Sequence, residues 1–338
     1  MSQPDDVARM ALFDLIYGYR ATQLVALAAR LEIAERLADG PQTAEELARA
    51  TATKPEALYR ALRALASLGV FEERDGRRFA LTPLSERLRA SHPESVRPHA
   101  LFAGGEIYRA WTELPFSVAT GETAFDHLFG MSHFAWLAEH PKENAVFNQV
   151  MSAGSVQAAA AIVAAYDFGE RGTVVDIAGG QGMLLAAILR ANPGLRGVVF
   201  DQPHVVASAE STMRAAGVAE RCEIVSGDFF ERVPPGGDIY TLRQIIHDWD
   251  DERATAILRN CAQALAPGGR IAVIEQVLPS GPGAGRAALL DMTMLIMTGG
   301  HERTAEEFAR LLSAVGLRLT RIVPTQAGAS VIEGERAE

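Results

Sequence analysis

The stretch Val174-Val-Asp-Ile-Ala-Gly-Gly-Gln-Gly182 is a short β-rich run that leads into a glycine-rich turn. A helical stretch, Met183–Ala191, follows the turn directly. A strand, a glycine turn and a helix in this order are typical of an open α/β sheet, in which ligands bind at the carboxyl ends of the strands. Glycines let a ligand approach the backbone closely, so the turn is a candidate binding site. The alternative is a plain tight turn without a ligand.

Strand and helix patterns alternate over the second half of the chain. Strands are expected at Thr173–Ile177, Gly197–Asp201, Cys222–Val225, Asp238–Leu242 and Arg270–Glu275. Helices are expected between and after them at Met183–Ala191, Val205–Ala216, Glu252–Leu265 and Asp291–Met297, with a further one capped by Thr304. This alternation predicts an α/β fold with a parallel, doubly wound sheet. Two closing runs, Leu317–Val323 and Ala329–Glu333, predict a hairpin at one edge.

The first hundred residues have a helical pattern. Thr43-Ala-Glu-Glu46 and Thr53-Lys-Pro-Glu56 both have the form of a capping box. Four leucines then recur at helical spacing on one face: Leu58, Leu62, Leu65 and Leu68. An Asp75-Gly76 turn between two short β-like runs is a hairpin signal. Two helices followed by a hairpin predict a winged-helix outline, and residues 101–168 continue as connecting helices.

Composition and charge exclude several classes of protein. The 338 residues are 48 % apolar and 22 % charged, an ordinary globular balance. Two cysteines, Cys222 and Cys261, are too few for a disulfide scaffold or a cysteine-only zinc site, and no metal is expected. The net charge of −10 falls on residues 101–338, and residues 1–100 are balanced. A duplex DNA binder normally presents a basic face, so no nucleic-acid partner is expected.

The sequence also predicts a soluble, cytoplasmic protein. Its first residues, MSQPDDVARM, lack the basic and apolar regions of a secretory signal. The longest uncharged run, Asn144–Tyr166, contains several polar residues. We interpret this run as a buried helix rather than a membrane span.

Three acidic residues near the strand ends indicate which nucleotide the turn binds. The third small residue of the dinucleotide fingerprint is missing after Gly182, and no P-loop sequence is present. Asp176 precedes the turn, and Asp201 ends the next strand, where a carboxylate can accept from both ribose hydroxyls. Asp228, beside Phe229, suits an adenine amine and ring. Ribose and adenine without a phosphate-cradling loop indicate S-adenosylmethionine.

The chain resembles the S-adenosylmethionine-dependent small-molecule O-methyltransferases of the plant caffeic-acid type and their bacterial relatives in antibiotic and phenazine tailoring. The resemblance covers nearly the whole length. The motifs that carry it, in order, are Asp176…Gly182, Phe200-Asp-Gln-Pro203, Gly227-Asp-Phe-Phe230, His247-Asp-Trp-Asp-Asp-Glu252, Ala266-Pro-Gly-Gly269 and Gly299-Gly-His-Glu-Arg-Thr304. Each motif alone is weak, and their common order makes the match specific.

This resemblance implies a fold and an assembly. It implies the Rossmann-like doubly wound sheet of class I methyltransferases in residues 169–338. It also implies an N-terminal all-α winged-helix dimerisation domain in residues 1–100, with the connecting helices of 101–168 lining the substrate pocket. The partners implied are an aromatic small-molecule acceptor of secondary metabolism and a second copy of the chain in an intertwined homodimer.

The resemblance also implies a set of cofactor-binding residues. In this family Asp201 would hold the ribose hydroxyls, Asp228 the adenine amine, and Ser155 would lie near the cofactor carboxylate. The full set is Ser155, Asp176, Ala178, Gly179, Gly180, Asp201, Gln202, Asp228, Phe229 and Arg243. Two positions depart from the family: Ala178 replaces a glycine and Arg243 replaces a lysine.

His247 is the candidate general base. Methyl transfer to a phenol requires removal of its proton, and histidine is suited to that task near neutral pH. His247 follows a strand end on the same sheet edge as the glycine turn. Two carboxylates at matching family positions, Glu275 and Glu302, are expected to orient the ring and stabilise its charged form. A structural histidine and a helix-capping Glu302 are the alternatives, and Asp248 is expected to turn away from its neighbour's ring.

Four further residues are candidates for substrate binding: Met151, Met294, Phe147 and Trp111. The two methionines match family methionines that sandwich the aromatic acceptor. The alternative for all four is an ordinary place in the hydrophobic core.

Three functions remain open at this point. The first is methylation of an aromatic hydroxyl through His247. The second is a family-fold enzyme that uses the cofactor for a non-methylating step such as hydroxylation, decarboxylation or a pericyclic reaction. The third is a winged-helix DNA-binding regulator.

Overall fold

The computed structural model describes residues 4–152, 154–281, 283 and 285–337. Contacts within the chain divide it into two compact units. Unit 1 comprises Met1–Thr112 and Phe134–Ala153, and unit 2 comprises Glu113–His133 and Gly154–Glu338. The three-part division at residues 100 and 168 stays a prediction, and each unit is described by itself.

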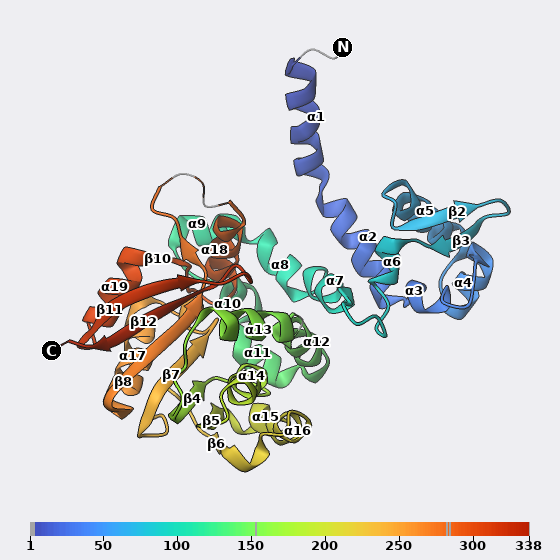
Figure 1. Ribbon diagram of the computed structural model, residues 1–338. Helices are drawn as coiled ribbons and strands as arrows, with labels where there is room; N and C mark the ends of the chain where they lie inside the picture. Colours follow the sequence, from blue (N-terminus) through green and yellow to red (C-terminus); the bar gives the residue numbers. More distant parts are fainter. Residues whose placement is uncertain (1–3, 153, 282, 284, 338) are drawn as a thin grey trace. The chain divides into compact units, whose positions relative to one another are not determined.

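Unit 1 is mostly helical (Figure 1). Its N-terminal helices are α1 (Pro4–Tyr17), α2 (Tyr19–Arg30), α3 (Ile33–Arg36), α4 (Ala44–Ala50), α5 (Pro55–Ser67) and α6 (Pro83–Glu86). Its later helices are α7 (Arg97–Ala103), α8 (Glu106–Thr112), α11 (His133–Glu139, from Phe134 onward) and α12 (Pro141–Ser152). A small sheet of β1 (Gln42–Thr43), β3 (Arg78–Leu81) and β2 (Phe71–Arg74) accompanies them. The unit is therefore helical with a small wing rather than all-α.

The winged-helix outline is confirmed, with two local corrections. Thr43 and Glu46 form the expected capping box, and β2 pairs antiparallel with β3. The second capping box is wrong: Lys54 is the N-cap of α5 and makes no side-chain bond there. A residue before proline is driven into an extended conformation, so Pro55 makes Lys54 the cap. Leu68, expected on the buried face, is the C-cap and is 49 % exposed.

Unit 2 contains a seven-stranded sheet with the order β11-β12-β8-β7-β4-β5-β6. The strands are β4 (Gly172–Ile177), β5 (Leu195–Asp201), β6 (Cys222–Ser226), β7 (Gly237–Arg243), β8 (Leu265–Glu275), β11 (Leu317–Pro324) and β12 (Ser330–Arg336). β6, β5, β4, β7 and β8 are parallel, and β12 runs antiparallel to both β8 and β11. The parallel core and its edge hairpin are confirmed.

Helices cover both faces of this sheet. Residues of α13 (Ser155–Ala165), α14 (Met183–Ala191), α15 (Pro203–Val206) and α16 (Ala209–Ala215) pack on one face, and residues of α17 (Asp251–Ala264) and α19 (Ala305–Ser313) pack on the other. The remaining helices of the unit, α9 (Leu114–Thr120), α10 (Ala124–Phe129) and α18 (Gly285–Met297), contact one another. Two short strands, β9 (Val277–Leu278) and β10 (Arg303–Thr304), form a separate two-stranded parallel sheet. Among the described residues they pair with no strand of the seven-stranded sheet.

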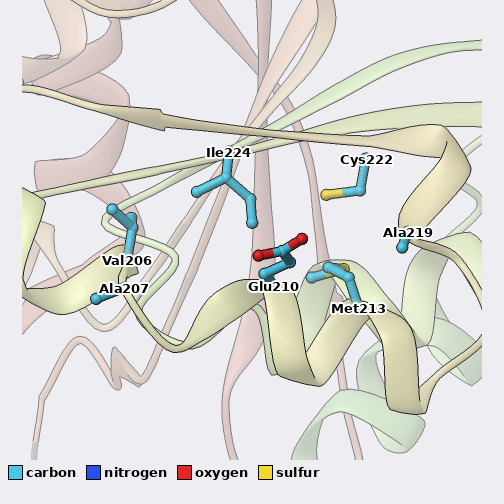
Figure 2. Close-up of a pocket in the computed structure, with 7 residues that line it drawn as sticks. All are labelled: Val206, Ala207, Glu210, Met213, Ala219, Cys222 and Ile224. Atoms are coloured by element: carbon cyan, nitrogen blue, oxygen red, sulfur yellow. The ribbon is translucent and has the colours of Figure 1, made fainter.

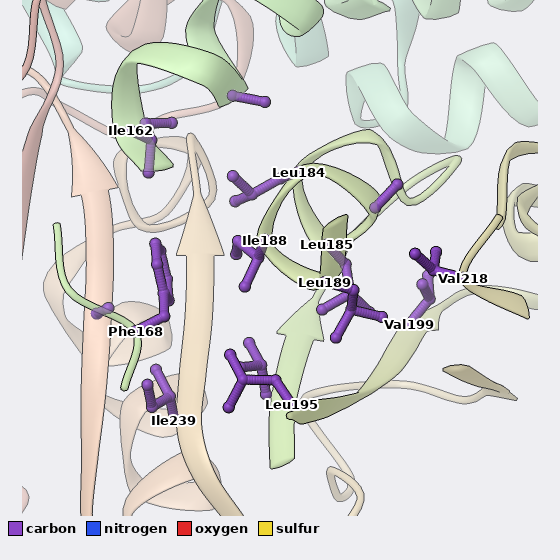
Figure 3. Packing of buried hydrophobic residues seen from close by; sticks show 14 of the residues in the cluster. Ile162, Phe168, Leu184, Leu185, Ile188, Leu189, Leu195, Val199, Val218 and Ile239 are labelled. Carbon is purple, nitrogen blue, oxygen red and sulfur yellow. The ribbon is translucent and has the colours of Figure 1, made fainter. Parts of the chain in front are cut away.

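Strand alternation divides the core of unit 2 into two layers. Successive strand residues face opposite sides of a sheet. Val174 and Ile239 pack with the leucine-rich face of α14 and with α13 (Figure 3). Their neighbours Val175 and Tyr240 pack on the other side, with α17 and α19. Both faces are apolar and buried, so the carboxyl edge of the sheet is where polar groups collect.

Two expected helices are each interrupted. The helix expected at Val205–Ala216 is two short helices, α15 and α16, because Pro203 starts the first one early and Ser208 is the N-cap of the second. The single buried helix expected at Asn144–Tyr166 is also wrong. It is α12 and α13, with Gly154 in the left-handed conformation at φ 72° as N-cap of α13, and each helix buries one face only.

The stretch Pro141–Ala165 has the length and hydropathy of a membrane span, and 24 % of its most apolar window is buried. Its two helices have 12 and 11 residues. Length and composition alone would allow this stretch to cross a membrane, and an apolar core helix of a globular protein meets the same criteria.

A buried carboxylate ties the edge hairpin to the rest of unit 2. Glu333, on β12, accepts hydrogen bonds from the Tyr166 hydroxyl at 2.6 Å and from Thr320 at 2.6 Å. Arg321 donates to it through two nitrogens at 3.0 and 2.9 Å. Burial alone raises the pKa of Glu333, and these hydrogen bonds outweigh burial and lower it. The group therefore stabilises the fold above the unfolded pKa of 4.5, and this stabilisation is lost as the pH falls through the lowered value.

We predict that Glu333→Ala lowers the free energy of unfolding at pH 7 by about 2–4 kcal/mol, because it leaves buried partners unpaired. The matched control is Glu335→Ala, on the same face of β12, which should cost less than about 0.5 kcal/mol. Urea unfolding at pH 7 and at acid pH measures both. A Glu333→Ala loss equal to the control, or one that does not shrink in acid, would contradict the prediction.

Candidate active site

The glycine-rich turn follows β4 at the carboxyl edge of the sheet. Ala178, Gly180 and Gly182 all have positive φ, at 51°, 59° and 78°. Gly182 is the N-cap of α14, and a Cβ there would collide with the side chain of Met213. A Cβ on Gly179 would lie 2.8 Å from a carboxylate oxygen of Asp176. The turn is therefore packed tightly on its inner side, and glycine is required for steric reasons as well as for its dihedral angles.

Asp201 is fixed against this turn at the end of β5. One carboxylate oxygen accepts from the Gly180 N–H at 2.9 Å, and the other accepts from the Gln202 N–H at 2.6 Å. Burial raises its pKa, and the two backbone hydrogen bonds oppose that effect. Each oxygen keeps a further lone pair. The side chain is partly exposed, so it can accept from the two hydroxyls of a ribose.

Asp228 and Phe229 follow β6 and are held by a contact that the sequence did not reveal. Asp228 accepts from the Phe230 N–H at 2.8 Å and is exposed. Phe230 contacts the ring of Trp249 edge to face, with centroids 4.9 Å apart. Asn260 on α17 donates to the backbone oxygens of Phe229 and Phe230 at 2.8 and 3.0 Å. Asn260 and Trp249 therefore position a partly buried ring beside a carboxylate, as adenine requires.

A second polar group lies at the start of α13 and the end of β7. Nη1 of Arg243 lies 3.3 Å from the hydroxyl of the buried Ser155. Asp176 is buried and accepts from the Thr241 hydroxyl at 2.6 Å. Burial raises the Asp176 pKa to about 6, and the Thr241 bond and the Arg243 charge oppose it. A guanidinium at this edge can hold a carboxylate. Together with Asp201 and the tight turn, this set of groups fits S-adenosylmethionine.

His247 forms a short buried hydrogen bond. It lies in a 3₁₀ turn, Ile246–Asp248, and is 7 % exposed. Its Nδ1 is 2.7 Å from Oε1 of Glu302, which is 2 % exposed. An ionised carboxylate only accepts, so Nδ1 carries the hydrogen and Nε2 is the nitrogen that can exchange a proton with a substrate. Glu302 thus orients the ring; the helix cap is Thr304, as expected.

The other two carboxylates contact His247 in ways that differ from expectation. Oε1 of Glu275 accepts from the backbone N–H groups of Ile245 and His247, both at 3.1 Å, so Glu275 holds the turn and not the ring. Asp248 does not turn away: its Oδ1 lies 3.7 Å from Nε2 of His247. A 3₁₀ turn allows this approach between adjacent residues, which spacing alone did not reveal.

These carboxylates change the proton affinity of His247. Burial alone lowers the pKa of the imidazole. The hydrogen bond to Glu302 and the charges of Asp248, Glu275 and Glu302 outweigh burial and raise the pKa to about 10. The carboxylates therefore favour the protonated ring, and Nε2 can act as a base only after it has lost its proton. Burial also raises the pKa values of Asp248 and Glu275 to about 6 each.

The four candidate substrate residues fall in both units. Met294, on α18 of unit 2, is 8 % exposed. Trp111, Phe147 and Met151 belong to unit 1, where the Phe147 ring lies 6.0 Å from that of Phe102. Their common pocket stays a prediction.

A hollow of about 450 Å³ lies elsewhere in unit 2, beside the edge strand β6 (Figure 2). Its lining residues are Val206, Ala207, Glu210, Met213, Ala219, Cys222 and Ile224. None of them is a candidate site residue. Burial raises the pKa of the Cys222 thiol to about 11, which disfavours the thiolate form at neutral pH. Within the described part of the chain, no group of three or more His, Cys, Asp or Glu residues is arranged to hold a metal ion.

Comparison with known proteins shows the family of the chain. Residues 111–318 match the O-methyltransferase domain, and residues 13–91 match the O-methyltransferase dimerisation domain. The chain is 47 % identical over 322 residues to a phenazine O-methyltransferase of Lysobacter antibioticus, covering 95 % of this chain and 94 % of the relative. It is 32 % identical over 339 residues to a phenazine-1-carboxylate N-methyltransferase of Pseudomonas aeruginosa, covering 100 % of both.

Solved structures give the same result. The structure of a mitomycin 7-O-methyltransferase has a TM-score of 0.93 and 39 % identity, covering 98 % of this chain and 99 % of that one. An O-methyltransferase from neocarzinostatin biosynthesis, in complex with S-adenosylmethionine and 2-hydroxy-5-methyl naphthoic acid, has a TM-score of 0.86 and 34 % identity, covering 94 % and 96 %.

The chain belongs to the O-methyltransferase family. It is an S-adenosylmethionine-dependent enzyme with the class I methyltransferase fold and an N-terminal dimerisation domain, related to methyltransferases of bacterial antibiotic biosynthesis.

We predict that Asp201→Ala weakens S-adenosylmethionine binding about tenfold or more, because two charge-assisted hydrogen bonds to the ribose are lost. Calorimetry on the folded variant measures the dissociation constant. The control is Glu223→Ala, an exposed carboxylate on β6, which should bind as the parent does. Equal affinity in Asp201→Ala and the control would remove Asp201 from the site.

Proposed function

We propose that this protein transfers the methyl group of S-adenosylmethionine to a phenolic hydroxyl of an aromatic secondary metabolite, with His247 as general base. The observation that carries the proposal is the buried 2.7 Å contact between His247 and Glu302. It fixes the ring through Nδ1 and leaves Nε2 for proton exchange. The imidazole lies at the same sheet edge as the glycine turn. The 3₁₀ turn Ile246–Asp248 follows β7, the glycine turn follows β4, and these two strands are parallel neighbours.

The residues of the chain divide the reaction into binding, orientation and proton removal. When bound, S-adenosylmethionine supplies an electrophilic methyl group and a positive sulfonium charge. In its neutral form, after loss of the Nε2 proton, His247 would accept the proton of the acceptor hydroxyl through Nε2. The phenolic oxygen would take the methyl group, and the electron pair of the broken carbon–sulfur bond would stay on the cofactor sulfur. Glu302 stabilises the imidazolium that results. Glu275 keeps the turn in place through its two backbone contacts.

The other candidate site residues have supporting roles in this proposal. Asp201, with Gln202, would hold the ribose, Asp228 and Phe229 the adenine, and Arg243 with Ser155 the carboxylate of the cofactor. The turn itself consists of Ala178, Gly179 and Gly180, and the buried carboxylate of Asp176 packs against it next to Gly179. Met294, Met151, Phe147 and Trp111 are proposed to contact the acceptor. The dimerisation domain supports a homodimer, and we propose that the enzyme acts in the cytoplasm.

An amine acceptor is the second candidate, because one relative is named an N-methyltransferase. The carboxylate cluster favours a hydroxyl. A neutral amine already presents its lone pair, whereas a phenol needs a base, and three carboxylates around one imidazole serve a base. Non-methylating use of the cofactor remains an outcome of the same assay.

DNA binding by the winged helix is disfavoured by its own charge pairs. On α5, Glu56 accepts two bonds from Arg77 at 2.8 and 2.9 Å, and Arg63 lies 3.6 Å from Glu73. The basic side chains of this region are thus partly neutralised, where a DNA-binding face would leave them available to phosphates. A gel shift at low and high salt tests this directly.

We predict that His247→Ala keeps its affinity for the cofactor and lowers turnover by about 10²–10⁴-fold on a phenolic acceptor. A screen of phenols, flavonoids, phenazines and anthracyclines, with products weighed by mass spectrometry, identifies that acceptor. A product heavier by one CH₂, as expected when a methyl group replaces the hydroxyl hydrogen, supports methylation, and any other change in mass supports a non-methylating step. Parental turnover by His247→Ala at neutral pH would exclude it as the base.

We predict that Glu302→Gln lowers the pKa of His247 from about 10 toward or below the ordinary value of 6.5. The imidazolium loses its hydrogen-bonded counter-charge, while the burial that disfavours it remains. NMR titration of the cofactor-free protein measures this shift. A raised folded pKa stabilises the fold below pH 6.5 and ceases to do so as the pH rises through 10, so the stability difference from the parent should shrink over that range. Glu306→Gln, on α19, is the control and should leave the titration of His247 unchanged.

A further inference from the structure

Arg303 is a completely buried cation next to Glu302, and the proposed reaction assigns it no role. Its exposed fraction is 0 %. Its guanidinium directs bonds to four different oxygens, and these bonds use all five of its N–H groups. Nη1 donates to the backbone oxygens of Ile246 at 2.9 Å and His301 at 3.4 Å. Nη2 donates to the backbone oxygen of Trp249 at 2.8 Å.

The remaining bonds go to a counter-charge at the start of α17. Nε and Nη2 of Arg303 donate to Oδ1 of Asp251 at 3.1 and 2.8 Å. The Asp251 side chain is 65 % exposed, so it neutralises the arginine without being buried itself. A buried guanidinium whose N–H groups are all hydrogen-bonded holds its partners rigidly, because its planar shape fixes the direction of every bond. We call this set of bonds from Arg303 the bracket.

Two of these bonds enclose the turn that carries the proposed base. Ile246 precedes His247, and Trp249 follows Asp248, so the guanidinium bridges the two ends of the His247 turn. The same arginine is covalently next to Glu302. One side chain therefore connects the backbone of the imidazole to the backbone of the carboxylate that orients it.

The segment before Arg303 is pressed against the same turn. A Cβ on Gly300 would overlap the backbone oxygen of His247 and lie 2.6 Å from the backbone nitrogen of Trp249. On the other side, Arg303 pairs with Val277 in the β9–β10 ladder, two residues after Glu275. The backbone N–H of Glu302 donates to Asp291 on α18 at 2.8 Å. The carboxylate is thus anchored, and Arg303 is its link to the histidine turn.

We propose that Arg303 is a positioning residue that sets the distance between Nδ1 of His247 and Oε1 of Glu302. Its meaning for catalysis rests on the proposed function, but its effect on the two side chains does not. A charge-assisted hydrogen bond strengthens as its distance shortens, so a bracket that holds 2.7 Å strengthens the preference of His247 for its charged form. The charged groups that face or adjoin the histidine are Asp248, Glu275, Asp291, Glu302 and Arg303.

The test is Arg303→Lys, which keeps the positive charge and removes the planar fork. A lysine cannot bond Ile246, Trp249 and Asp251 in the same directions, so the two segments separate while the net charge of the cluster is unchanged. We expect the downfield NMR signal of the Nδ1 proton to weaken or shift, and the pKa of His247 to fall from about 10 toward 6.5. Turnover should fall about tenfold to a hundredfold, with the cofactor dissociation constant within about twofold of the parent.

Arg310→Lys is the matched control. Arg310 lies on α19, is exposed, and pairs only with Glu307 at 3.5 Å among the contacts described. It should leave the Nδ1 signal, the His247 titration and turnover at parental values. Gly300→Ala is the second test variant, since it separates the same two segments without touching any charge. It should move the His247 titration in the same direction as Arg303→Lys.

The outcomes separate this inference from the proposed function. A parental Nδ1 signal and a parental His247 pKa in a folded Arg303→Lys or Gly300→Ala protein would overturn the positioning role, as would a drop in melting temperature with an unchanged titration. If His247→Ala retains parental turnover, the base assignment fails, yet the NMR titration of the Arg303 variants still decides whether the bracket exists.

Discussion

The buried pair of His247 and Glu302 is the interaction on which the rest of the catalytic edge depends. An imidazole and a carboxylate at 2.7 Å, both nearly inaccessible to water, strengthen each other only while their geometry is kept. The two residues are 55 positions apart in the chain. The parallel sheet brings their segments to one edge, Glu275 holds the histidine turn by its backbone, and the packed glycine at position 300 allows the segments to meet.

Much of the fold could be predicted from the sequence because it follows from local periodicity. The five parallel strands were expected within three residues of their observed starts except β8, which begins at Leu265 rather than Arg270. Helix α14 was expected with its observed bounds. The predictions that were wrong concern helix ends, which depend on backbone conformation rather than on periodicity. Pro55 makes Lys54 the N-cap in place of Thr53, and the left-handed Gly154 divides one apolar run into two helices. Apolar patterning alone does not detect such breaks.

The site was predictable where motif and topology coincide. Strand ends at a common edge placed Asp201 and His247 together with the glycine turn, and Glu302 contacts the ring as the resemblance implied. Residues that act through side-chain direction or long-range bonding were missed. Asn260 fastens the Phe229 loop from 31 residues away, Asp248 approaches its neighbour's ring, and Arg303 reaches back 57 residues. No spacing rule gives these contacts.

The alanine at position 178 has a consequence for how the cofactor binds. A left-handed alanine costs on the order of 1–2 kcal/mol, so the surrounding structure must offset that cost. The neighbouring bonds from Gly179 to Phe200 and from Gly180 to Asp201 hold the backbone in this shape. These bonds come from the chain itself, so they hold the turn in one shape, and a turn held in this way loses little conformational entropy when a nucleoside binds to it. Affinity at this end of the site then comes with a small ordering cost.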